Sequence, residues 1–439
     1  MALGGVFMTD TDGNIGVETS NLSEKVCGLL FDISAQPDFW TSTPGQAVAP
    51  IFQNSVVEFN TLSEVVEAGI AEYTDLTDEN AANYLLNGVA YYHIKQYFEA
   101  VGGSGRLFVM FADCSTNWNA LIEMQSAARN CIGQIGVWTE QSIWKHVSDD
   151  AAYQFTLINE LNTVAASLAN DYYAPVSILL CPNSAKVKTA SGTSDVVVWS
   201  QIPNIVQDAR YVSVLLSQAI DSNVQVMQRT LASKTPVGTV GVALAELTKG
   251  NVAESIGWVQ QHNVAAYFQD IEFGFGDVSG ETELTSTTKY ASLSRAQLDE
   301  LDDKGYIFLV RYAGLENGVY FSGDQTCSSK DYRTIARNRV MNKSRRNVRT
   351  ALLPYVNSPI KVDPATGKLS AAQITIFTNL VTTVLQAMVN AEEISGIGVV
   401  DVPAAQNILK NDRLMLKYSM IPIGSAKAIE VTEGFALNQ

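Results

Sequence analysis

The sequence predicts a mixed fold, in which an α/β domain is followed by a smaller α+β domain, with an extended arm at each end of the chain. In roughly the first 300 residues, short apolar segments of strand character alternate with segments of helical period. That alternation is typical of a mostly parallel sheet covered by helices on both faces. After it, two long helices are followed by segments with strand-like alternation. A chain of 439 residues is long enough for two or three domains.

The first domain is expected over residues 23–300. Its buried strands are predicted at 25–34, 56–60, 106–111, 132–138, 176–181, 211–216 and 237–243. Thr61 and Glu64 have the spacing of a capping box and predict a short helix. Longer helices are predicted over 83–101, where Gly102 and Gly103 end the helix, and over 153–172.

The second domain is expected over residues 301–425. A short helix with a cap at Ser294 is predicted over 294–303, a strand over 306–312, and a basic helix over 329–352. Ser370 and Gln373 then predict the start of a long helix, whose apolar side chains repeat at helical spacing as far as Met388 and belong to a core. The segments 414–421 and 428–435 have strand-like alternation. A terminal strand is an unpaired edge unless a partner covers it, so residues 1–22 and 426–439 are expected to be arms.

Composition excludes several classes of protein. The net charge of −16 repels nucleic acid and anionic membranes, so binding of that kind requires a local basic patch. Charged residues make up 17% of the chain, below the roughly 25% of average proteins, which indicates a surface covered by other subunits. Five scattered cysteines predict reduced thiols rather than a disulfide framework. No export signal is expected, and no stretch is expected to be long enough to cross a bilayer.

The sequence shows no catalytic constellation, and we expect no enzyme activity, cofactor or metal site. None of the three histidines stands at metal-binding spacing from another ligand. The glycines between 102 and 105 lie between a helix and a strand, which is the reverse of the order in a phosphate-binding loop. Asp10, Asp12 and Asn14 begin like a calcium loop, but Ile15 and Asn21 replace the required glycine and glutamate.

The basic helix is the main candidate site. No acidic residue stands between Asp331 and Asp363, although seven arginines and lysines stand from Arg333 to Arg349. On a helical projection, Arg339, Lys343 and Arg346 fall opposite the apolar positions. A solvated helix face usually mixes both signs of charge, so this face is predicted to bind an acidic partner. The alternative is a nucleic-acid-binding protein that uses the helix 329–352.

This helix and its surroundings resemble the contractile tail sheath proteins of phages, tailocins and related contractile injection systems. The resemblance rests on Gly305-Tyr-Ile-Phe, Gly318-Val-Tyr-Phe, Asp331-Tyr-Arg-Thr-Ile-Ala-Arg-Asn-Arg, the helix from Ser370 to Glu393, the Gly396-Ile-Gly turn and the closing strands. It covers roughly the last 140 residues. The N-terminal segment lacks the Pro-Gly-Val-Tyr opening that is common in sheaths, and the chain is shorter than the large multidomain members.

The resemblance implies a structural subunit of a bacteriophage-like virion tail or injection particle, assembled in the bacterial host cytoplasm. Such subunits form hexameric rings that stack helically around an inner tube and contract to drive the tube through a target envelope. The α/β domain would lie outside and the domain 301–425 beside the tube. The implied partners are other copies of the chain, the tube protein, and baseplate and tail terminator proteins, without nucleic acid and without direct membrane insertion.

The resemblance also implies roles for particular residues. The arms would enter the sheets of neighbouring subunits by strand augmentation. The implied arm contacts are Val6, Phe7, Met8, Ile429, Val431 and Phe435. The implied tube-binding residues are Arg339, Lys343, Arg346 and Arg349.

Overall fold

The structure is a computed structural model that describes residues 23–34, 54–70, 72, 88–141, 143, 145–146, 153–182, 202–219, 237–268, 270–273 and 288–434. The N-terminal arm expected at residues 1–22, with Val6, Phe7 and Met8, lies outside these ranges. Phe435 of the expected C-terminal arm also lies outside them.

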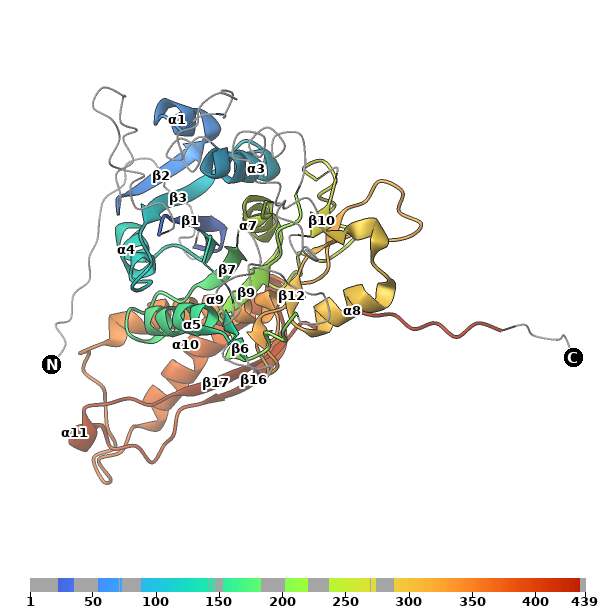
Figure 1. Cartoon of the computed structure of the whole chain (residues 1–439). Coiled ribbons are helices and arrows are strands. Elements are labelled where there is room, and N and C mark those ends of the chain that lie inside the picture. Colours follow the sequence, from blue (N-terminus) through green and yellow to red (C-terminus); the bar gives the residue numbers. More distant parts are fainter. Residues whose placement is uncertain are drawn as a thin grey trace, which may run out of the picture.

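A seven-stranded sheet forms the centre of the first part of the chain (Figure 1). The strands are β1 (Val26–Asp32), β2 (Val56–Thr61), β3 (Ser104–Ala112), β4 (Gln134–Thr139), β7 (Ser177–Pro182), β9 (Val212–Leu215) and β12 (Tyr306–Ile307). Their order is β12-β9-β7-β4-β1-β3-β2, and all neighbouring pairs are parallel except β2 with β3. The predicted mostly parallel sheet is confirmed.

Helices cover both faces of this sheet, as the alternation of strands and helices predicts. One face packs against α1 (Leu62–Glu67), α3 (Tyr91–Val101) and α7 (Val240–Lys249). The other packs against α4 (Ala120–Ala127), α5 (Thr156–Asn170) and α8 (Arg295–Asp303). Within β1, Leu29 and Phe31 belong to the first core and Leu30 to the second, so both faces of the strand are buried.

Short elements complete the described part of this region. They are η1 (Ser23–Lys25), β5 (Lys145–His146), β6 (Tyr153–Gln154), β8 (Asp208–Ala209), β10 (Glu272–Phe273), β11 (Thr288–Lys289), η5 (Tyr290–Ser292), β13 (Leu309–Val310), β14 (Tyr320–Phe321) and β15 (Cys327–Ser328). The predicted caps are confirmed. Thr61 Oγ1 accepts from the backbone N–H of Glu64 at 3.4 Å, Ser294 and Gln297 form a capping box, and Gly102 ends α3 with a φ of 89°.

The prediction of a strand over 237–243 is wrong, because the segment from Val240 onwards is the helix α7. The helix is buried along its length between α3 and the sheet, so its apolar residues do not alternate. A short apolar run of this kind does not distinguish a buried strand from a buried helix. Gly241 permits the packing, since a Cβ there would lie 2.1 Å from the backbone oxygen of His93.

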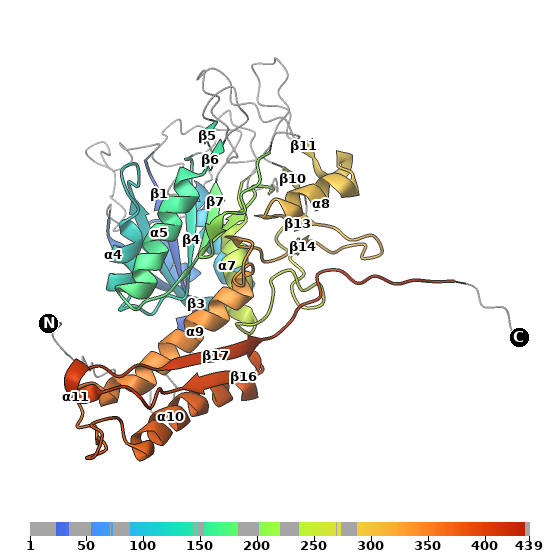
Figure 2. The ribbon, with the colours of Figure 1, turned by 90° about the horizontal axis from the view of Figure 1, so that it is seen from below.

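The last part of the chain forms a separate layer of two helices and a strand pair. It contains α9 (Ile335–Leu352), η6 (Leu353–Tyr355), α10 (Ala371–Asn390), β16 (Ile394–Asp401), α11 (Ile408–Asn411) and β17 (Lys417–Pro422). The predicted cap of α10 is confirmed, because Ser370 Oγ accepts from the N–H of Gln373 at 3.4 Å. Figure 2 shows α10 and the antiparallel pair β16–β17 on the side of α9 away from the seven-stranded sheet.

The two parts of the chain are connected through β12. Tyr306 pairs with Val214 and Ile307 with Leu215, so β12 is the edge strand of the large sheet. The second domain, expected to begin at residue 301, therefore contributes its first strand to the sheet of the first domain. Residues 428–434 of the strand expected over 428–435 pair with no other strand that the structure describes, and for the assembly this strand stays a prediction.

Candidate functional site: the basic helix and the C-terminal segment

The helix α9 begins at a capped end and packs its apolar side on the second domain. Thr334 Oγ1 accepts from the N–H of Arg337 at 3.3 Å. Val340 and Val348 are buried in one cluster with Val381 and Leu385 of α10. This leaves the basic side of α9 facing the first domain, where the strands of the parallel sheet begin.

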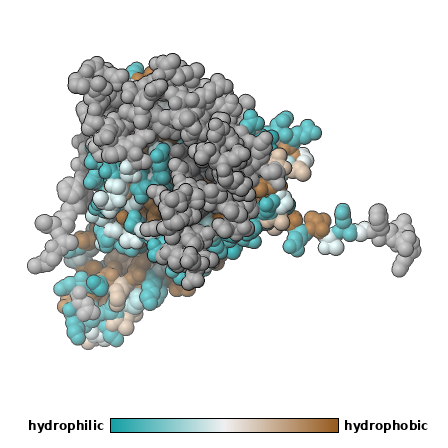
Figure 3. Space-filling view, viewed as in Figure 1, coloured by the Kyte–Doolittle hydropathy of each residue, from teal (hydrophilic) through white to brown (hydrophobic). Residues whose placement is uncertain are grey.

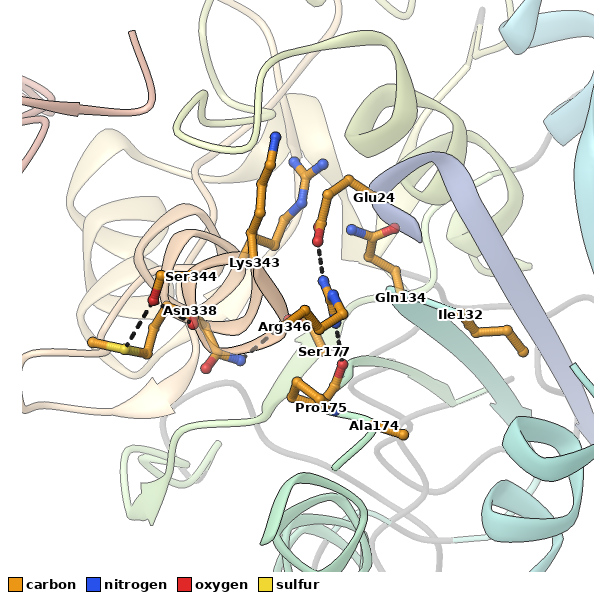
Figure 4. A network of polar contacts seen from close by, with 12 residues as sticks. Glu24, Ile132, Gln134, Ala174, Pro175, Ser177, Asn338, Lys343, Ser344 and Arg346 are labelled. Carbon is orange, nitrogen blue, oxygen red and sulfur yellow. Dashed lines mark hydrogen bonds and ion pairs between the residues drawn. The ribbon is translucent and has the colours of Figure 1, made fainter. Parts of the chain in front are cut away.

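Arg346 connects α9 to the start of β1 and β7. Its guanidinium forms an ion pair with Glu24 and donates from Nη1 to the carbonyl oxygen of Pro175 at 2.7 Å (Figure 4). The two charged side chains are only 14% and 6% exposed. Charged partners that are this well buried attract each other strongly, and removal of one leaves the other uncompensated.

Arg339 lies deeper in the same interface and is only 2% exposed. Its Nη2 donates to the carbonyl oxygen of Leu247, at the end of α7, at 2.7 Å. The side-chain amide of Gln134 is oriented so that both its oxygen and its nitrogen have a hydrogen-bond partner. The oxygen accepts from Arg339 Nε at 2.9 Å, and the nitrogen donates to the backbone carbonyl of Glu24 at 3.2 Å. Burial lowers the pKa of Arg339, and the carboxylate of Glu24 opposes that effect. The guanidinium stays charged, as arginine does in proteins.

Lys343 is turned toward the second domain instead. It forms an ion pair with Glu393, the residue before β16, and both side chains are 8% exposed. One turn earlier, Asn338 donates to Ser177 Oγ, at the start of β7, at 3.1 Å. Figure 4 shows these side chains of α9 beside Glu24, Gln134, Pro175 and Ser177.

The expectation that Arg339, Lys343 and Arg346 project from a free basic face is therefore wrong. Their charges are satisfied within the chain. Arg339 and Arg346 hold the second domain against the first, and Lys343 is paired inside the second domain. The alternative of nucleic-acid binding depended on the same face, which the structure does not present to solvent. Of the four expected tube-binding residues, only Arg349 is exposed, with its guanidinium 4.3 Å from the ring centroid of Tyr173.

The C-terminal segment 423–434 is the second candidate site. All its residues are exposed, with Ile429 at 83% and Val431 at 80%. It leaves β17 and runs out beyond the body of the molecule (Figures 1 and 2). Near its start, Lys427 forms an ion pair of 2.5 Å with Asp302 of α8. The alternating apolar side chains beyond this point contact nothing that buries them.

The strand pair β16–β17 could accept such a segment. Among the described residues, the two strands pair only with each other, so each has an open edge. Ile397, Val400 and Tyr418 pack toward the helices, whereas Val399 and Ile421 are 65% and 54% exposed. Unpaired edges of this kind are templates for a strand from another chain.

Two family models match the sequence one after the other. DUF2586, N-terminal domain, matches residues 3–325, and DUF2586, C-terminal domain, matches residues 331–439. The chain belongs to the DUF2586 family. The C-terminal domain of the family thus contains α9, α10, β16, α11, β17 and the C-terminal segment of this chain. No curated protein sequence matches this DUF2586 chain.

Solved structures from contractile machines share the fold of this DUF2586 chain. A chain of the anti-feeding prophage (AFP) baseplate, 6-fold symmetrised, aligns with a TM-score of 0.55 at 12% identity over 100% of both chains. The AFP helical sheath in its contracted state aligns with a TM-score of 0.53 at 12% sequence identity over 99% of both chains. The PVC sheath complex of an extracellular contractile injection system, in its contracted state, aligns with a TM-score of 0.56 at 8% sequence identity. The alignment covers 99% of this chain and 98% of that chain. The resemblance to contractile tail sheath proteins is confirmed at the level of the fold.

Two histidines and a cysteine of the DUF2586 chain are buried in its core. Both ring nitrogens of His93 lack a hydrogen-bond partner in the described part of the structure, and burial lowers its pKa to about 3. His262 Nδ1 lies 2.7 Å from Glu246 Oε2 inside the protein. Burial raises the pKa of the Cys27 thiol to about 12. Over the described ranges, no three histidine, cysteine or acidic side chains gather as metal ligands.

One helix in the described part of the chain, α10, is long and apolar enough to cross a membrane by length and composition. The expectation that no stretch reaches this length is therefore wrong. Phe377, Val381 and Leu385 nevertheless bury one side of α10 within the second domain. A helix that contributes to a protein core passes the same test, so the result is weak evidence for a membrane span.

Proposed function

We propose that this chain is the sheath subunit of a contractile tail or injection particle. Its fold matches that of sheath subunits over nearly the whole length of both chains. The observation that carries the proposal is the exposed, unpaired C-terminal segment, which has no function in a solitary molecule. A structural subunit of a lattice needs such a segment, and it needs no catalytic site.

In this proposal the chain forms hexameric rings that stack helically around an inner tube, and contraction of the stack drives the tube through a target envelope. The partners are further copies of the chain, the tube protein, and the baseplate and terminator proteins at the two ends. The particle is assembled in the cytoplasm of the bacterial host. A baseplate and two contracted sheaths among the structures with the same fold support this assignment.

The arms would connect the subunits. Ile429 and Val431 stand two residues apart, so in an extended strand they point to the same side and can fill a partner's apolar surface. We assign their binding site to the open edges of β16–β17 in a neighbouring copy. Phe435 continues the alternation of the C-terminal arm, and Val6, Phe7 and Met8 form the corresponding contacts of the N-terminal arm.

The polar network of α9 gives the subunit the rigidity that this mechanism requires. The buried ion pair of Arg346 with Glu24 and the buried hydrogen bond from Arg339 to Leu247 fix the second domain to the first. A change of lattice would therefore move the subunit as a body while the arms keep neighbours connected. The energy of contraction comes from repacked interfaces and requires no nucleotide. Arg349 is the one expected tube-binding residue on the surface, and we keep that role for it.

Imaging of the purified protein by negative-stain electron microscopy, with and without its tube protein, tests the proposal. We expect hollow striated cylinders from the natural chain and none from the variant I429D/V431D. The variant should keep the natural melting temperature, because both side chains are almost fully exposed. The matched control E430Q changes the other side of the same segment and should form cylinders. A natural chain that forms no polymer in either condition, or I429D/V431D cylinders of natural length, would contradict the proposal.

A further inference from the structure

Charge is divided unequally between the two parts of the chain. Residues 331–439 hold thirteen arginines and lysines against eight acidic residues, a net charge of +5. Residues 1–330 hold the remaining sixteen basic and thirty-seven acidic residues, a net charge of −21. One chain thus contains a basic domain and a strongly acidic domain, although its overall charge of −16 hides the difference.

Several cations of the basic domain are already paired within the chain. Lys343 is paired with Glu393, Arg346 with Glu24, and Lys427 with Asp302. Seven other cations are exposed and form no ion pair with any residue that the structure describes. Four of the seven stand in two segments that pack against each other. We call this group the basic tip, which consists of Lys361, Lys368, Lys410 and Arg413.

Packing brings the two segments of the basic tip together. The N–H of Leu369 donates to the carbonyl oxygen of Gln406 at 3.4 Å. A Cβ placed on Gly367 would lie 3.6 Å from Nδ2 of Asn407 and 4.0 Å from a methyl carbon of Leu409. The turn that holds Lys361 and Lys368 therefore lies against the segment that holds Lys410 and Arg413.

Two anions stand in the same segments, and one of them is engaged by the backbone. Oδ1 of Asp363 accepts from the N–H groups of Ala365 and Thr366, at 2.7 and 3.3 Å. Asp412 is exposed. The basic tip thus retains an excess of two positive charges. Leu409, 70% exposed, and Met415, 50% exposed, add apolar surface beside it, and exposed apolar surface rimmed by charge is typical of a protein interface.

The basic tip and the C-terminal segment lie at opposite ends of the molecule. In Figures 1 and 2, α11 marks one end and the C-terminal segment leaves from the other. In Figure 3 the lobe below and to the left, which holds α11, shows hydrophilic and hydrophobic residues side by side. A surface so far along the molecule is free to meet another subunit.

We propose that the basic tip binds the acidic α/β domain of a second copy of this chain. The chain itself supplies the opposite charge, and attraction between unlike domains offsets the repulsion between two molecules of charge −16. The two contacting surfaces differ, so the contact is heterologous and extends into an open or helical series of subunits. This inference rests on the proposed self-assembly, and it adds an ionic contact to the apolar arms.

Sedimentation velocity of the full chain tests the proposal at about 50 mM and about 500 mM salt, which differ strongly in screening. Self-association of the natural chain should weaken at least about tenfold at the higher salt. The variant K361E/K368E/K410E/R413E should show an equally large loss at the lower salt while it keeps its melting temperature. The matched control R129E/R295E makes the α/β domain more acidic, and it should associate as well as the natural chain or better.

The outcomes separate this proposal from the sheath assignment. Salt-sensitive association that depends on the basic tip supports the proposal even if no cylinders form, and in that case the sheath assignment fails alone. Association of the fourfold variant that equals that of the natural chain would overturn the proposal and leave the sheath assignment intact. If the fourfold variant self-associated normally but no longer assembled with the tube protein, the proposal would also be overturned, and the basic tip would be assigned to tube binding.

Discussion

Arg346 of α9 and Glu24 at the start of β1 form an ion pair across 322 residues of sequence. The pair joins the basic helix to the N-terminal end of a central strand of the large sheet, and Pro175 supplies a further acceptor to the same guanidinium. Two of the three basic side chains that the sequence assigns to an external partner, Arg339 and Arg346, thus hold the two domains of the subunit together. The third, Lys343, is paired inside the second domain. The consequences of this arrangement can be measured in the isolated protein.

Replacement of Glu24 by glutamine should lower the free energy of unfolding by about 3 kcal/mol, because it leaves the buried charge of Arg346 without its counterion. Urea unfolding followed by circular dichroism measures the change. The control D299N removes the partner of Arg295 in an exposed pair and should cost less than about 1 kcal/mol. Equal effects of the two substitutions would contradict the role of the network.

Two arginines of the same helix should respond differently to truncation. Arg339→Ala should cost about 3 kcal/mol or more, since it deprives the Leu247 carbonyl and Gln134 of their partner in a buried site. Arg349→Ala removes an exposed cation over Tyr173 and should cost about 0.5 to 1 kcal/mol. Thermal melts of both variants provide the comparison. If Arg339→Ala were as mild as Arg349→Ala, the burial of the basic face would be refuted.

His93 should make the protein less stable in acid. Its pKa is about 3 in the folded chain, against an ordinary value of 6.5, so the unfolded state binds a proton in this range and the folded state does not. Stability therefore rises with pH between about 3 and 6.5, by up to about 1.4 kcal/mol per pH unit from this one group.

The variant His93→Phe isolates this contribution, since the other titrating groups are the same in both proteins. The ring centroids of Phe31 and Tyr92 lie 6.4 and 5.3 Å from that of His93, so a phenyl ring suits the environment. Unfolding measured at pH 4.5 and at pH 7 should show a smaller difference in stability for the variant. An unchanged difference would show that His93 does not titrate as its burial requires.

Gly241→Ala should destabilise the fold by at least about 2 kcal/mol, although alanine favours helices over glycine. The added methyl group would lie 2.1 Å from the backbone oxygen of His93, so α3 and α7 would have to move apart. Gly424→Ala is the matched control, since nothing lies within 4 Å of its added carbon, and it should change stability by less than about 0.5 kcal/mol. A stabilised Gly241→Ala variant would contradict the close packing of these helices.

Sequence reasoning recovered the elements whose signals are local. The caps at Thr61, Ser294 and Ser370 and the apolar stripe of α10 depend on residues within a few positions of one another, and they predicted the elements well. The segment 237–243 failed because a short apolar run has no period that separates a strand from a helix buried on all sides.

The site was harder to predict than the fold. A helical projection correctly separated the apolar side of α9 from the basic side, but it does not show whether a side meets solvent or the rest of the protein. The partners Glu24 and Glu393 lie 322 and 50 residues away and have no local signature. The basic tip was missed for the same reason, because only packing brings the segment that holds Lys368 against the segment that holds Lys410. The absence of acidic residues between 332 and 362 indicates that the basic side chains of this stretch need partners elsewhere. The chain itself supplies three of these partners, namely Glu393, Glu24 and the carbonyl oxygen of Leu247.

The most direct test of the proposed assembly is a cryo-electron microscopy reconstruction of the polymer formed by the natural chain. We expect residues 423–434 to form a strand against β16–β17 of a neighbouring copy, with Ile429 and Val431 buried there. A reconstruction in which this segment folds back on its own subunit, or a protein that stays a solitary particle at every concentration, would contradict the assembly.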